Sequence, residues 1–459
     1  MLRASAICEE AGFPTVSLIS DGFLGQAGMI SKALRFEKLP VARLAGHPGV
    51  QSEEELKRNV RKYTVPEVIS GLTRDAEQQP GKRDDESPEP TAGSSVFAGT
   101  LDQVNAHFVG KEWSDGLPIV PPTRDRIQLF LKQTQRSADD VVATLVPEER
   151  TATVWSIAVN GVMAGCRPEY MPILIALVEA MSDPAYGLEH SGNSPGSDTL
   201  IILNGPIIRK LGFNYTQGVM RDGFLPNTSI GRFWRLALRN LAGFLPHKID
   251  KATFGNTWRV VVPENEEVLA KIGWPSVSTE MGFASNDDTV TISRFAGGQP
   301  VVSVTGSTPE EVLPYVAWSM VRQHSWHLAF TFDMGNGTLR PLLLLSPVLA
   351  ETIAAAGWSK RRVKEYLFEH ARMPAWEIER LREWQGSAGW SLAGEAKRGA
   401  IHPQFAESDD PNRMLPLVVE PDHFMIAVTG DPLRTNAYVF GHNGHFGFPV
   451  TKRIESTSM

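Results

Sequence analysis

Cys166 is the side chain in this sequence whose type and position most suggest reactivity. Arg167 and Pro168 follow it, and the apolar run over residues 173–178 predicts that a helix begins at this point. A thiol at the positive end of a helix dipole and beside a guanidinium is stabilised as the thiolate, its nucleophilic form. We therefore predict that Cys166 is a nucleophile or a redox thiol and that Arg167 stabilises it. The alternative is a structural role, because free cysteines are often fully buried.

Three arginines recur on one face of a predicted helix. Arg232, Arg235 and Arg239 are three and four residues apart within a helix expected over 227–240. Asn227, as the expected N-cap residue, would leave backbone N–H groups free to hold an anion. Guanidinium groups bind carboxylates and phosphates well, so the arginines are predicted to anchor an anionic substrate. The alternative is a solvated helix face with ordinary ion pairs.

Two asparagines occupy positions at which α/β proteins bind ligands. Asn204 follows the predicted buried strand over 199–203, and ligands gather at the carboxyl ends of strands in such folds. Asn193 lies in the Gly- and Ser-rich loop that precedes this strand. Either amide is predicted to orient the bound molecule. The alternative is that both loops are turns rich in Gly, Asn and Pro that hold no ligand.

Histidines raise the question of a metal ion. His324 and His327 are three residues apart near the predicted end of a helix, and Asp333 follows them. Two imidazoles and a carboxylate would form a metal triad. The sequence lacks the Glu that a zincin motif places between its histidines, and a histidine near a helix C-terminus is already stabilised by the dipole. The turn over 442–445, with two imidazoles, is a weaker signal. No metal site is predicted.

Asp115 lies in a predicted turn. It precedes Gly116 and an extended segment that Pro118, Pro121 and Pro122 hold in shape. Its carboxylate has the chemistry of an acid or base, but Asp-Gly is also favourable turn chemistry, and a turn is the prediction.

Residues 349–367 have the outline of a helix-turn-helix. A predicted helix, a glycine turn and a second, basic helix follow one another, as in DNA-binding proteins. The basic residues of the second helix are Lys360, Arg361, Arg362 and Lys364. Because an apolar strand leads directly into this segment and the whole chain is acidic, paired helices on a domain surface are the preferred interpretation.

The order of predicted elements indicates an α/β fold in two parts. Residues 1–74 alternate between helices and strands, with strands over 14–20 and 41–44, and predict a piece of parallel sheet that is too small by itself. Residues 75–97 are charged, contain almost no apolar side chains and are predicted to be a disordered linker. Residues 98–459 are predicted to form one large α+β domain that contains the active site.

The composition is that of a globular protein. The chain has 459 residues, with 42% hydrophobic and 21% charged side chains and a net charge of −7. The acidic balance argues against nucleic acid as a partner, and no apolar run reaches the ~18 residues that a membrane-spanning helix needs. Two cysteines, Cys8 and Cys166, exclude a disulfide scaffold and, without a signal-peptide pattern, favour the cytoplasm.

Part of the N-terminal segment resembles a bacterial family. Residues 9–16 (Glu-Glu-Ala-Gly-Phe-Pro-Thr-Val) and 45–49 (Ala-Gly-His-Pro-Gly) are similar to UGSC-type proteins. These carry a selenocysteine- or cysteine-Gly-Ser-Cys redox motif and are distantly similar to the selenoprotein of glycine reductase. The resemblance covers about 60 of the 459 residues. The helix that follows the motif in the family is already under way at Met1, and Cys8 lies within it, so no catalytic residue is carried over. The remaining chain resembles an uncharacterised bacterial domain found with such modules.

These observations favour an enzyme of small-molecule metabolism that uses Cys166 on a small anionic substrate. The resemblance implies thiol redox or carbon–heteroatom chemistry, as in an oxidoreductase or a lyase. Two alternatives are open: a non-catalytic ligand-binding or accessory subunit of a redox enzyme, and a helix-turn-helix regulator of DNA. The protein partner would be a redox subunit or a second copy of the chain. No cofactor is indicated, since neither a Gly-x-Gly-x-x-Gly after a strand nor a P-loop motif is present.

Overall fold

The computed structural model describes residues 2–34, 36–74, 93–331, 337–385 and 389–455. Helices alternate with strands, and the strands form parallel and mixed sheets, which confirms the predicted α/β class. The predicted linker over 75–97 lies outside the described residues as far as 92, and residues 93–97 contain no helix or strand. No helix in the described part combines the length and the apolar character that crossing a bilayer requires.

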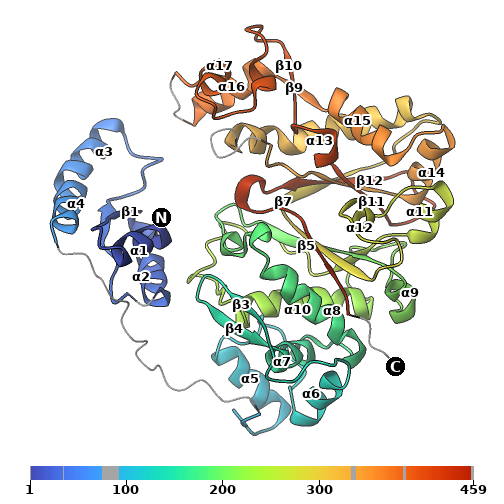
Figure 1. Cartoon of the computed structure of the whole chain (residues 1–459), viewed down its shortest axis with the longest axis horizontal. Coiled ribbons are helices and arrows are strands. Elements are labelled where there is room, and N and C mark those ends of the chain that lie inside the picture. Colours follow the sequence, from blue (N-terminus) through green and yellow to red (C-terminus); the bar gives the residue numbers. More distant parts are fainter. Residues whose placement is uncertain (1, 35, 75–92, 332–336, 386–388, 456–459) are drawn as a thin grey trace.

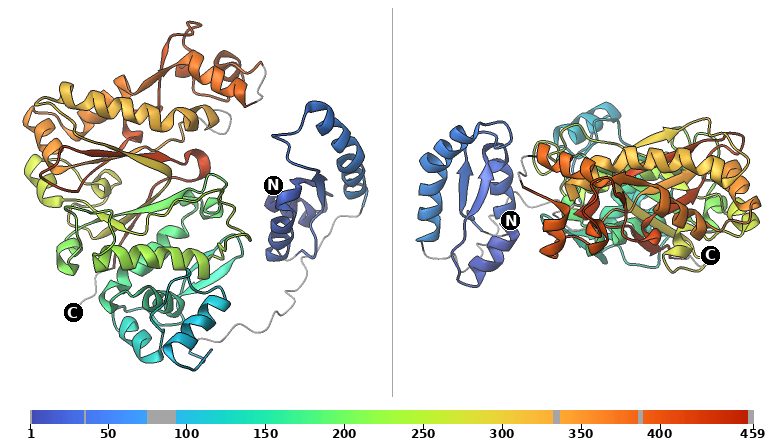
Figure 2. Two further views of the ribbon diagram at one scale, coloured as in Figure 1. Left: turned by 180° about the vertical axis from the view of Figure 1, so that it is seen from behind. Right: turned by 90° about the horizontal axis from the view of Figure 1, so that it is seen from above.

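Residues 2–74 form a small unit around a two-stranded parallel sheet (Figure 1). Its elements are α1 (Leu2–Glu10), β1 (Ser17–Ser20), α2 (Leu24–Ala33), β2 (Val41–Leu44), α3 (Glu53–Asn59) and α4 (Val65–Leu72). Gly12, with a φ of 83°, follows the end of α1 as the sequence predicts. The amide of Gln26 donates a hydrogen bond to the carbonyl of Ile249 in the large domain, beside which the unit stands (Figure 2).

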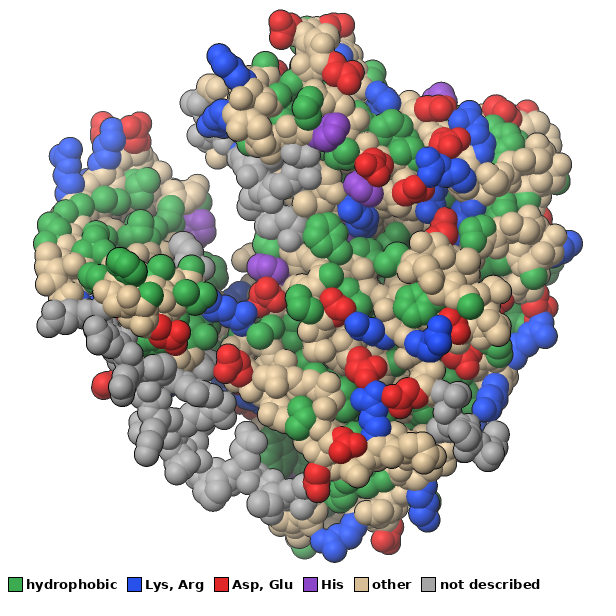
Figure 3. Space-filling model, in the orientation of Figure 1, with side chains coloured by type: hydrophobic (Ala, Val, Ile, Leu, Met, Phe, Trp, Pro, Cys, Tyr) green, Lys and Arg blue, Asp and Glu red, His purple; other side chains and the backbone are tan. Residues whose placement is uncertain are grey.

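The surface of this small unit is rich in apolar side chains. Ile7, Phe13 and Ile69 are 68%, 67% and 57% exposed. Hydrophobic side chains cover much of the visible face of the unit, whereas acidic and basic side chains are interspersed over the large domain (Figure 3). Parallel sheets are normally covered on both faces and have more than two strands. The unit therefore has less sheet and less core than such a fold usually contains.

The large domain contains most of the elements. Its helices are α5 (Leu101–Gly110), α6 (Arg124–Leu131), α7 (Val154–Ala164), α8 (Met171–Met181), α9 (Ile207–Leu211), α10 (Leu225–Asn240), α11 (Glu266–Ile272), α12 (Val277–Glu280), α13 (Pro309–Thr331), α14 (Pro347–Ala355), α15 (Lys360–His370), α16 (Ala375–Trp384) and α17 (Leu392–Lys397). Its strands are β3 (Val141–Leu145), β4 (Arg150–Thr153), β5 (Asp198–Asn204), β6 (Val261–Pro263), β7 (Thr289–Val301), β8 (Leu342–Leu345), β9 (Arg372–Pro374), β10 (Met414–Pro416), β11 (Met425–Val428), β12 (Ala437–His442) and β13 (Val450–Arg453). Strands β3 and β4, and likewise β9 and β10, form separate antiparallel pairs.

The long strand β7 organises the main sheet. The strand order is β11-β8-β12-β7-β5-β6, and β13 also pairs with β7. The first part of β7 pairs with β5 and β13, and its last part pairs with β12, in each case antiparallel. The outer pairs, β11 with β8 and β5 with β6, are parallel. A single strand thus belongs to both halves of the sheet.

The two halves of this sheet pack against each other. Leu200 and Ile202 of β5 share one buried cluster with Leu342 and Leu344 of β8. Ile201, which points to the opposite face of β5, packs in a second cluster with side chains of α7, α8 and α10. Helices α13 and α15 cover the outer face of the other half (Figure 1). The arrangement places α10 and its arginines directly under β5 and β6.

Candidate functional site

Cys166 lies in a buried connection between two helices. Helix α7 is closed by Gly165 in left-handed backbone with a φ of 80°. Pro168 opens a helical turn, as predicted, but it is a 3-10 turn over Pro168–Tyr170, and α8 begins at Met171. Cys166 therefore lies one turn before the N-terminus of α8, and its side chain belongs to the buried core of this part of the domain.

Burial decides the ionisation of Cys166. It raises the pKa of the thiol to about 12, although the neighbouring Ser229 side chain and the charge of Arg232 act to lower it. The prediction of a lowered pKa is therefore wrong, because removing the thiolate from water outweighs the two neighbouring groups. Arg167 is not the counter-ion that the sequence suggests, since its guanidinium lies over the ring of Tyr170, 5.0 Å from the ring centre.

Arg232 holds a buried carboxylate close to this thiol. Its Nε and Nη2 donate to the two carboxylate oxygens of Asp115 at 3.1 and 2.9 Å, and Nη2 also donates to the carbonyl of Pro118 at 3.0 Å. Burial raises the pKa of Asp115, but the hydrogen bonds and charge of Arg232 outweigh it, so the pKa is lowered. The predicted turn at Asp115 is present, with Gly116 at a φ of 88°. Helix α10 thus gathers Cys166, Arg232 and Asp115 from separate parts of the sequence.

The other arginines of α10 also bind parts of the fold. The Nη1 of Arg235 donates to the buried carboxylate of Asp198 at 3.0 Å, and the Nε of Arg239 donates to the carbonyl of Glu112 at 2.6 Å. The prediction that these three arginines anchor an anionic substrate is therefore wrong, because each guanidinium group already binds another part of the fold. The arginines attach the extended segment after Glu112 and the start of β5 to α10.

The start of α10 also differs from the prediction. The helix begins at Leu225, so Asn227 lies inside it and is not the N-cap. The amide of Asn227 is buried and donates to the carbonyls of Asn214 and Val261 at 2.8 and 2.9 Å. The predicted anion seat at Asn227 is therefore not formed.

Asn193 and Asn204 are both engaged within the fold. The Oδ1 of Asn193 accepts from the backbone N–H of Ser197 at 3.2 Å, which closes its loop. Asn204 ends β5, as the sequence predicts, and its Nδ2 donates to Glu264 at 2.9 Å and to Glu266 at 3.2 Å. Burial raises the pKa of both glutamates. The Nδ2 of Asn204 is thus occupied by two carboxyl groups at the strand ends, whereas its buried Oδ1 has no hydrogen-bond partner among the described residues.

A cleft of about 780 Å³ opens beside α10. Two segments line it, Gly218–Asp222 and Thr257–Val260. The second segment packs so closely on α10 that a Cβ atom on Gly231 would lie 2.2 Å from the carbonyl carbon of Arg259. The charge of Arg259 also contributes to the lowered pKa of Asp115. The cleft therefore adjoins the group formed by Cys166, Arg232 and Asp115.

The lining of the cleft combines two cations with an aromatic ring. The Nε of Arg259 donates to the hydroxyl of Thr257 at 3.1 Å. Neither Arg221 nor Arg259 forms an ion pair with an acidic side chain in the described part of the chain. The indole of Trp258 meets the ring of Phe440 edge-on at 5.1 Å, and its buried Nε1–H has no hydrogen-bond partner among the described residues. Such a lining suits a planar molecule with a negative charge.

Sequence reasoning missed Arg221, Trp258 and Arg259. They come from two irregular segments, and neither segment has a recognisable motif. The only feature of the sequence that indicates these residues is an aromatic residue followed by a cation at 258–259, and such pairs are common on protein surfaces. The tight contact at Gly231, which decides where the second segment lies, cannot be read from spacing.

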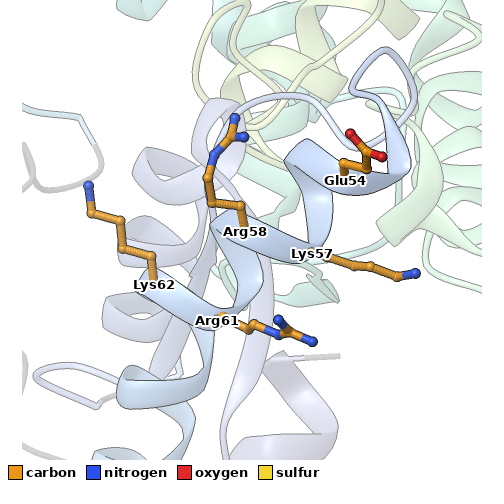
Figure 4. Close-up of a pocket in the computed structure, with 5 residues that line it drawn as sticks. All are labelled: Glu54, Lys57, Arg58, Arg61 and Lys62. Carbon is orange, nitrogen blue, oxygen red and sulfur yellow. The ribbon is translucent and has the colours of Figure 1, made fainter.

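A second, shallow hollow of about 500 Å³ lies on the small N-terminal unit. It is lined by Glu54, Lys57, Arg58, Arg61 and Lys62, which come from α3 and the following helical turn (Figure 4). Figure 4 shows these side chains extending outward from the helix in several directions, with Lys57 and Arg61 on the same side. Side chains that diverge in this way do not converge on one small ligand. We interpret this surface as a solvated, charged helix face.

The two histidines of α13 do not lie at a helix end. The helix continues to Thr331, so His324 and His327 are in its interior, and Asp333 lies outside the described residues. Within the described ranges, no three or more His, Cys, Asp and Glu side chains are grouped so as to hold a metal ion.

Helices α14 and α15 form the predicted pair, but the basic residues of α15 are committed to ion pairs. The buried Lys360 and Lys364 have their Nζ atoms 3.2 and 2.7 Å from the carboxylate of Glu280. The guanidinium of Arg361 lies 2.6 Å from the carboxylate of Asp422. These charges are balanced by acids of the same chain, unlike those of a surface that binds DNA phosphates.

Known proteins do not place this chain in a family. It matches no protein-family model, no curated protein and no solved structure. The similarity of residues 9–16 and 45–49 to the UGSC-type family stays a prediction. Function must therefore be inferred from the cleft and the residues beside α10.

Proposed function

We propose that this protein binds a small planar anion, such as an aromatic carboxylate or phosphate, in the cleft lined by Arg221, Trp258 and Arg259. The observation that carries this proposal is that two arginines without an ion pair to an acidic side chain among the described residues line one cleft together with the indole of Trp258. Ligand binding is one of the alternatives that the sequence left open. The arginines that would bind the ligand are Arg221 and Arg259, and not those predicted on α10. The two-cysteine composition favours the cytoplasm as its compartment.

Size and chemistry support this assignment. A volume of about 780 Å³ lies within the range of small-molecule sites, roughly 300–1,000 Å³. A guanidinium can donate two parallel hydrogen bonds to a carboxylate or phosphate. The indole of Trp258 offers an apolar surface to a flat ring. Asp222 also lines the cleft, so the lining carries one net positive charge and matches a monoanion best.

Calorimetric titration of the full chain with benzoate, phenyl phosphate and neutral benzamide tests the proposal. We expect benzoate or phenyl phosphate to bind more tightly than benzamide. Arg259→Met should weaken anion binding about tenfold or more, as expected when a charge-assisted hydrogen bond is lost. The exposed Arg380, on α16, gives the matched control Arg380→Met, which should bind like the unaltered protein. Equal binding of benzamide and benzoate, or no effect of Arg259→Met, would rule the site out.

A second candidate function is thiol chemistry at Cys166. It is favoured by one observation, namely that Ser229 and Arg232 both act to lower the pKa of this buried thiol. An anion in the adjoining cleft disfavours the thiolate, because like charges repel, so such chemistry requires Cys166 to react while the cleft is empty. In a Cys8→Ser protein, the rate of alkylation by iodoacetamide should then fall when phenyl phosphate is present at saturation. An unchanged rate would leave Cys166 a structural residue.

A further inference from the structure

The cleft beside α10 contains a third ionic side chain, Asp222. It is exposed and comes from the same segment as Arg221, whereas Arg259 comes from the other segment. In the part of the chain that the structure describes, the carboxylate of Asp222 forms no ion pair with either arginine or with another cation. Opposite charges therefore line one cleft without being paired with each other.

The turn that carries Arg221 and Asp222 is fixed at both ends. It begins at Gly218, whose φ of 71° glycine adopts readily, and the backbone N–H of Arg221 donates to the carbonyl of Gly218 at 2.7 Å. At the other end, the backbone N–H of Gly223 donates to the hydroxyl of Thr228 on α10 at 3.2 Å. The backbone of Asp222 is thereby held beside the start of α10.

The segment that carries Arg259 is attached to α10 independently. The backbone N–H of Trp258 donates to the buried carboxylate of Asp198 at 3.2 Å, and this carboxylate also accepts from Arg235 of α10 at 3.0 Å. The close packing of Gly231 against the carbonyl group of Arg259 fixes the same segment a second time. Helix α10 thus holds both walls of the cleft, and the two segments cannot approach each other without breaking these contacts.

The charges of the lining favour a ligand that carries both signs. A molecule with negative groups alone is attracted by the two arginines but repelled by Asp222, and like charges placed side by side oppose binding. An ammonium group on the ligand replaces this repulsion with a charge-assisted hydrogen bond. Two acidic groups and one ammonium group match the three ionic side chains, and a molecule with these groups is still a monoanion.

We propose that the ligand of this cleft is an aromatic amino acid whose ammonium group binds Asp222. This inference rests on the function proposed above, because the acidic groups bind Arg221 and Arg259 and the ring lies against Trp258. One of these acidic groups is the α-carboxylate, and the other is a substituent of the ring. Asp222 is then the residue that distinguishes an amino acid from an aromatic acid that lacks the ammonium group.

Calorimetric titration of the full chain with hydrocinnamate and phenylalanine tests the role of Asp222. The two molecules have the same ring and carboxylate, and only phenylalanine carries an ammonium group. We expect phenylalanine to bind about tenfold more tightly, from one additional hydrogen bond between charged groups. Asp222→Asn should reverse this order, because the ammonium group then faces two arginines without its partner. Asp409→Asn, which removes an exposed charge outside the cleft, is the matched control and should keep the preference for phenylalanine.

Two further measurements complete the test. Asp222→Glu keeps the negative charge and should keep the preference for phenylalanine that Asp222→Asn loses. The ligand para-carboxyphenylalanine adds the second acidic group and should bind more tightly than phenylalanine, and Arg221→Met should remove this gain.

The outcomes separate this inference from the proposed function. If hydrocinnamate binds and Arg259→Met weakens its binding, the cleft is an anion site. If phenylalanine then binds no better than hydrocinnamate, or if Asp222→Asn leaves its preference unchanged, the role of Asp222 is wrong while the anion site stands. If neither molecule binds, the proposed function and this inference are both wrong.

Discussion

Cys166 and Asp115 both lie near Arg232, and burial raises the pKa of both, yet the net shifts of the two groups are opposite. Asp115 accepts two direct hydrogen bonds from the guanidinium, and these outweigh its loss of water, so its pKa is lowered. Ser229 and the charge of Arg232 lower the pKa of Cys166 only in part, so burial prevails and its pKa rises to about 12. The carboxyl group is therefore ionised at neutral pH, and the thiol is not.

Cys166 is expected to resist alkylation in the native protein. In a Cys8→Ser background, iodoacetamide should label little of it from about pH 6 to 9, because few thiols with a pKa of about 12 are ionised there. Intact mass measured against pH gives the labelled fraction. The same protein in guanidinium chloride is the control and should label with a midpoint near pH ~8.5. A native midpoint at or below that value would show an accessible, activated thiol.

Replacement of Asp115 by Asn is expected to destabilise the fold in a pH-dependent way. The variant leaves Arg232 largely buried without its counter-charge, which costs about 3–5 kcal/mol for a broken buried pair. Because the folded pKa of Asp115 is lowered, its contribution is full above the unfolded value of ~3.9 and is lost as the pH falls through the folded value. Urea unfolding at several pH values should thus show that the difference in the free energy of unfolding between the variant and the wild type becomes smaller in acid. A difference that does not change with pH would mean that the ion pair contributes nothing.

Individual elements were predictable where periodicity or capping residues specify them. The strand ending at Asn204 and the helix that carries Arg232 are present, because runs of apolar residues mark both. The paths of the two segments that line the cleft, 218–222 and 257–260, were not predictable, since they depend on contacts between residues far apart in the chain. The arginine spacing was recognised, but the partners of Arg235 and Arg239 come from other elements that the spacing does not specify.

Gly231 is the position at which α10 sets the geometry of the cleft. Gly231→Ala should lower stability, although alanine favours a helix by about 1 kcal/mol, because the new Cβ meets the backbone of Arg259 and Val260. It should also weaken benzoate binding, since the clash displaces the segment that carries Trp258. Gly28, within α2, has open space around it, so Gly28→Ala should be neutral or stabilising. Chemical unfolding and calorimetry measure the two effects, and equal behaviour of both variants would contradict this account.

At the scale of the whole molecule, the small N-terminal unit and the large domain differ in how much core they contain. The small unit has one limited buried cluster, whereas the large domain has three extensive ones. The contacts between them include the Gln26–Ile249 hydrogen bond and the packing of Met29 against the large domain. We therefore expect the large domain to fold without residues 2–74.

A protein that begins at Gly93 should consequently fold and bind as the full chain does. We expect its Tm to lie within about 4 °C of the full chain, which corresponds to roughly 3 kcal/mol in a protein of this size. Its affinity for benzoate should be unchanged. Scanning calorimetry and titration check both values. A large loss of stability would show that the small unit is an integral part of the fold.

Strand β7 has a consequence for the way this protein is made. Its neighbours β12 and β13 leave the ribosome only after roughly 150 further residues, which takes about ten to thirty seconds at ordinary translation rates. During that time β7 can pair only with β5. The backbone N–H and C=O groups in its C-terminal half have no partner strand and can pair with other chains. The yield of this protein in a host should therefore follow the supply of chaperones and the pace of translation more closely than the stability of the finished fold.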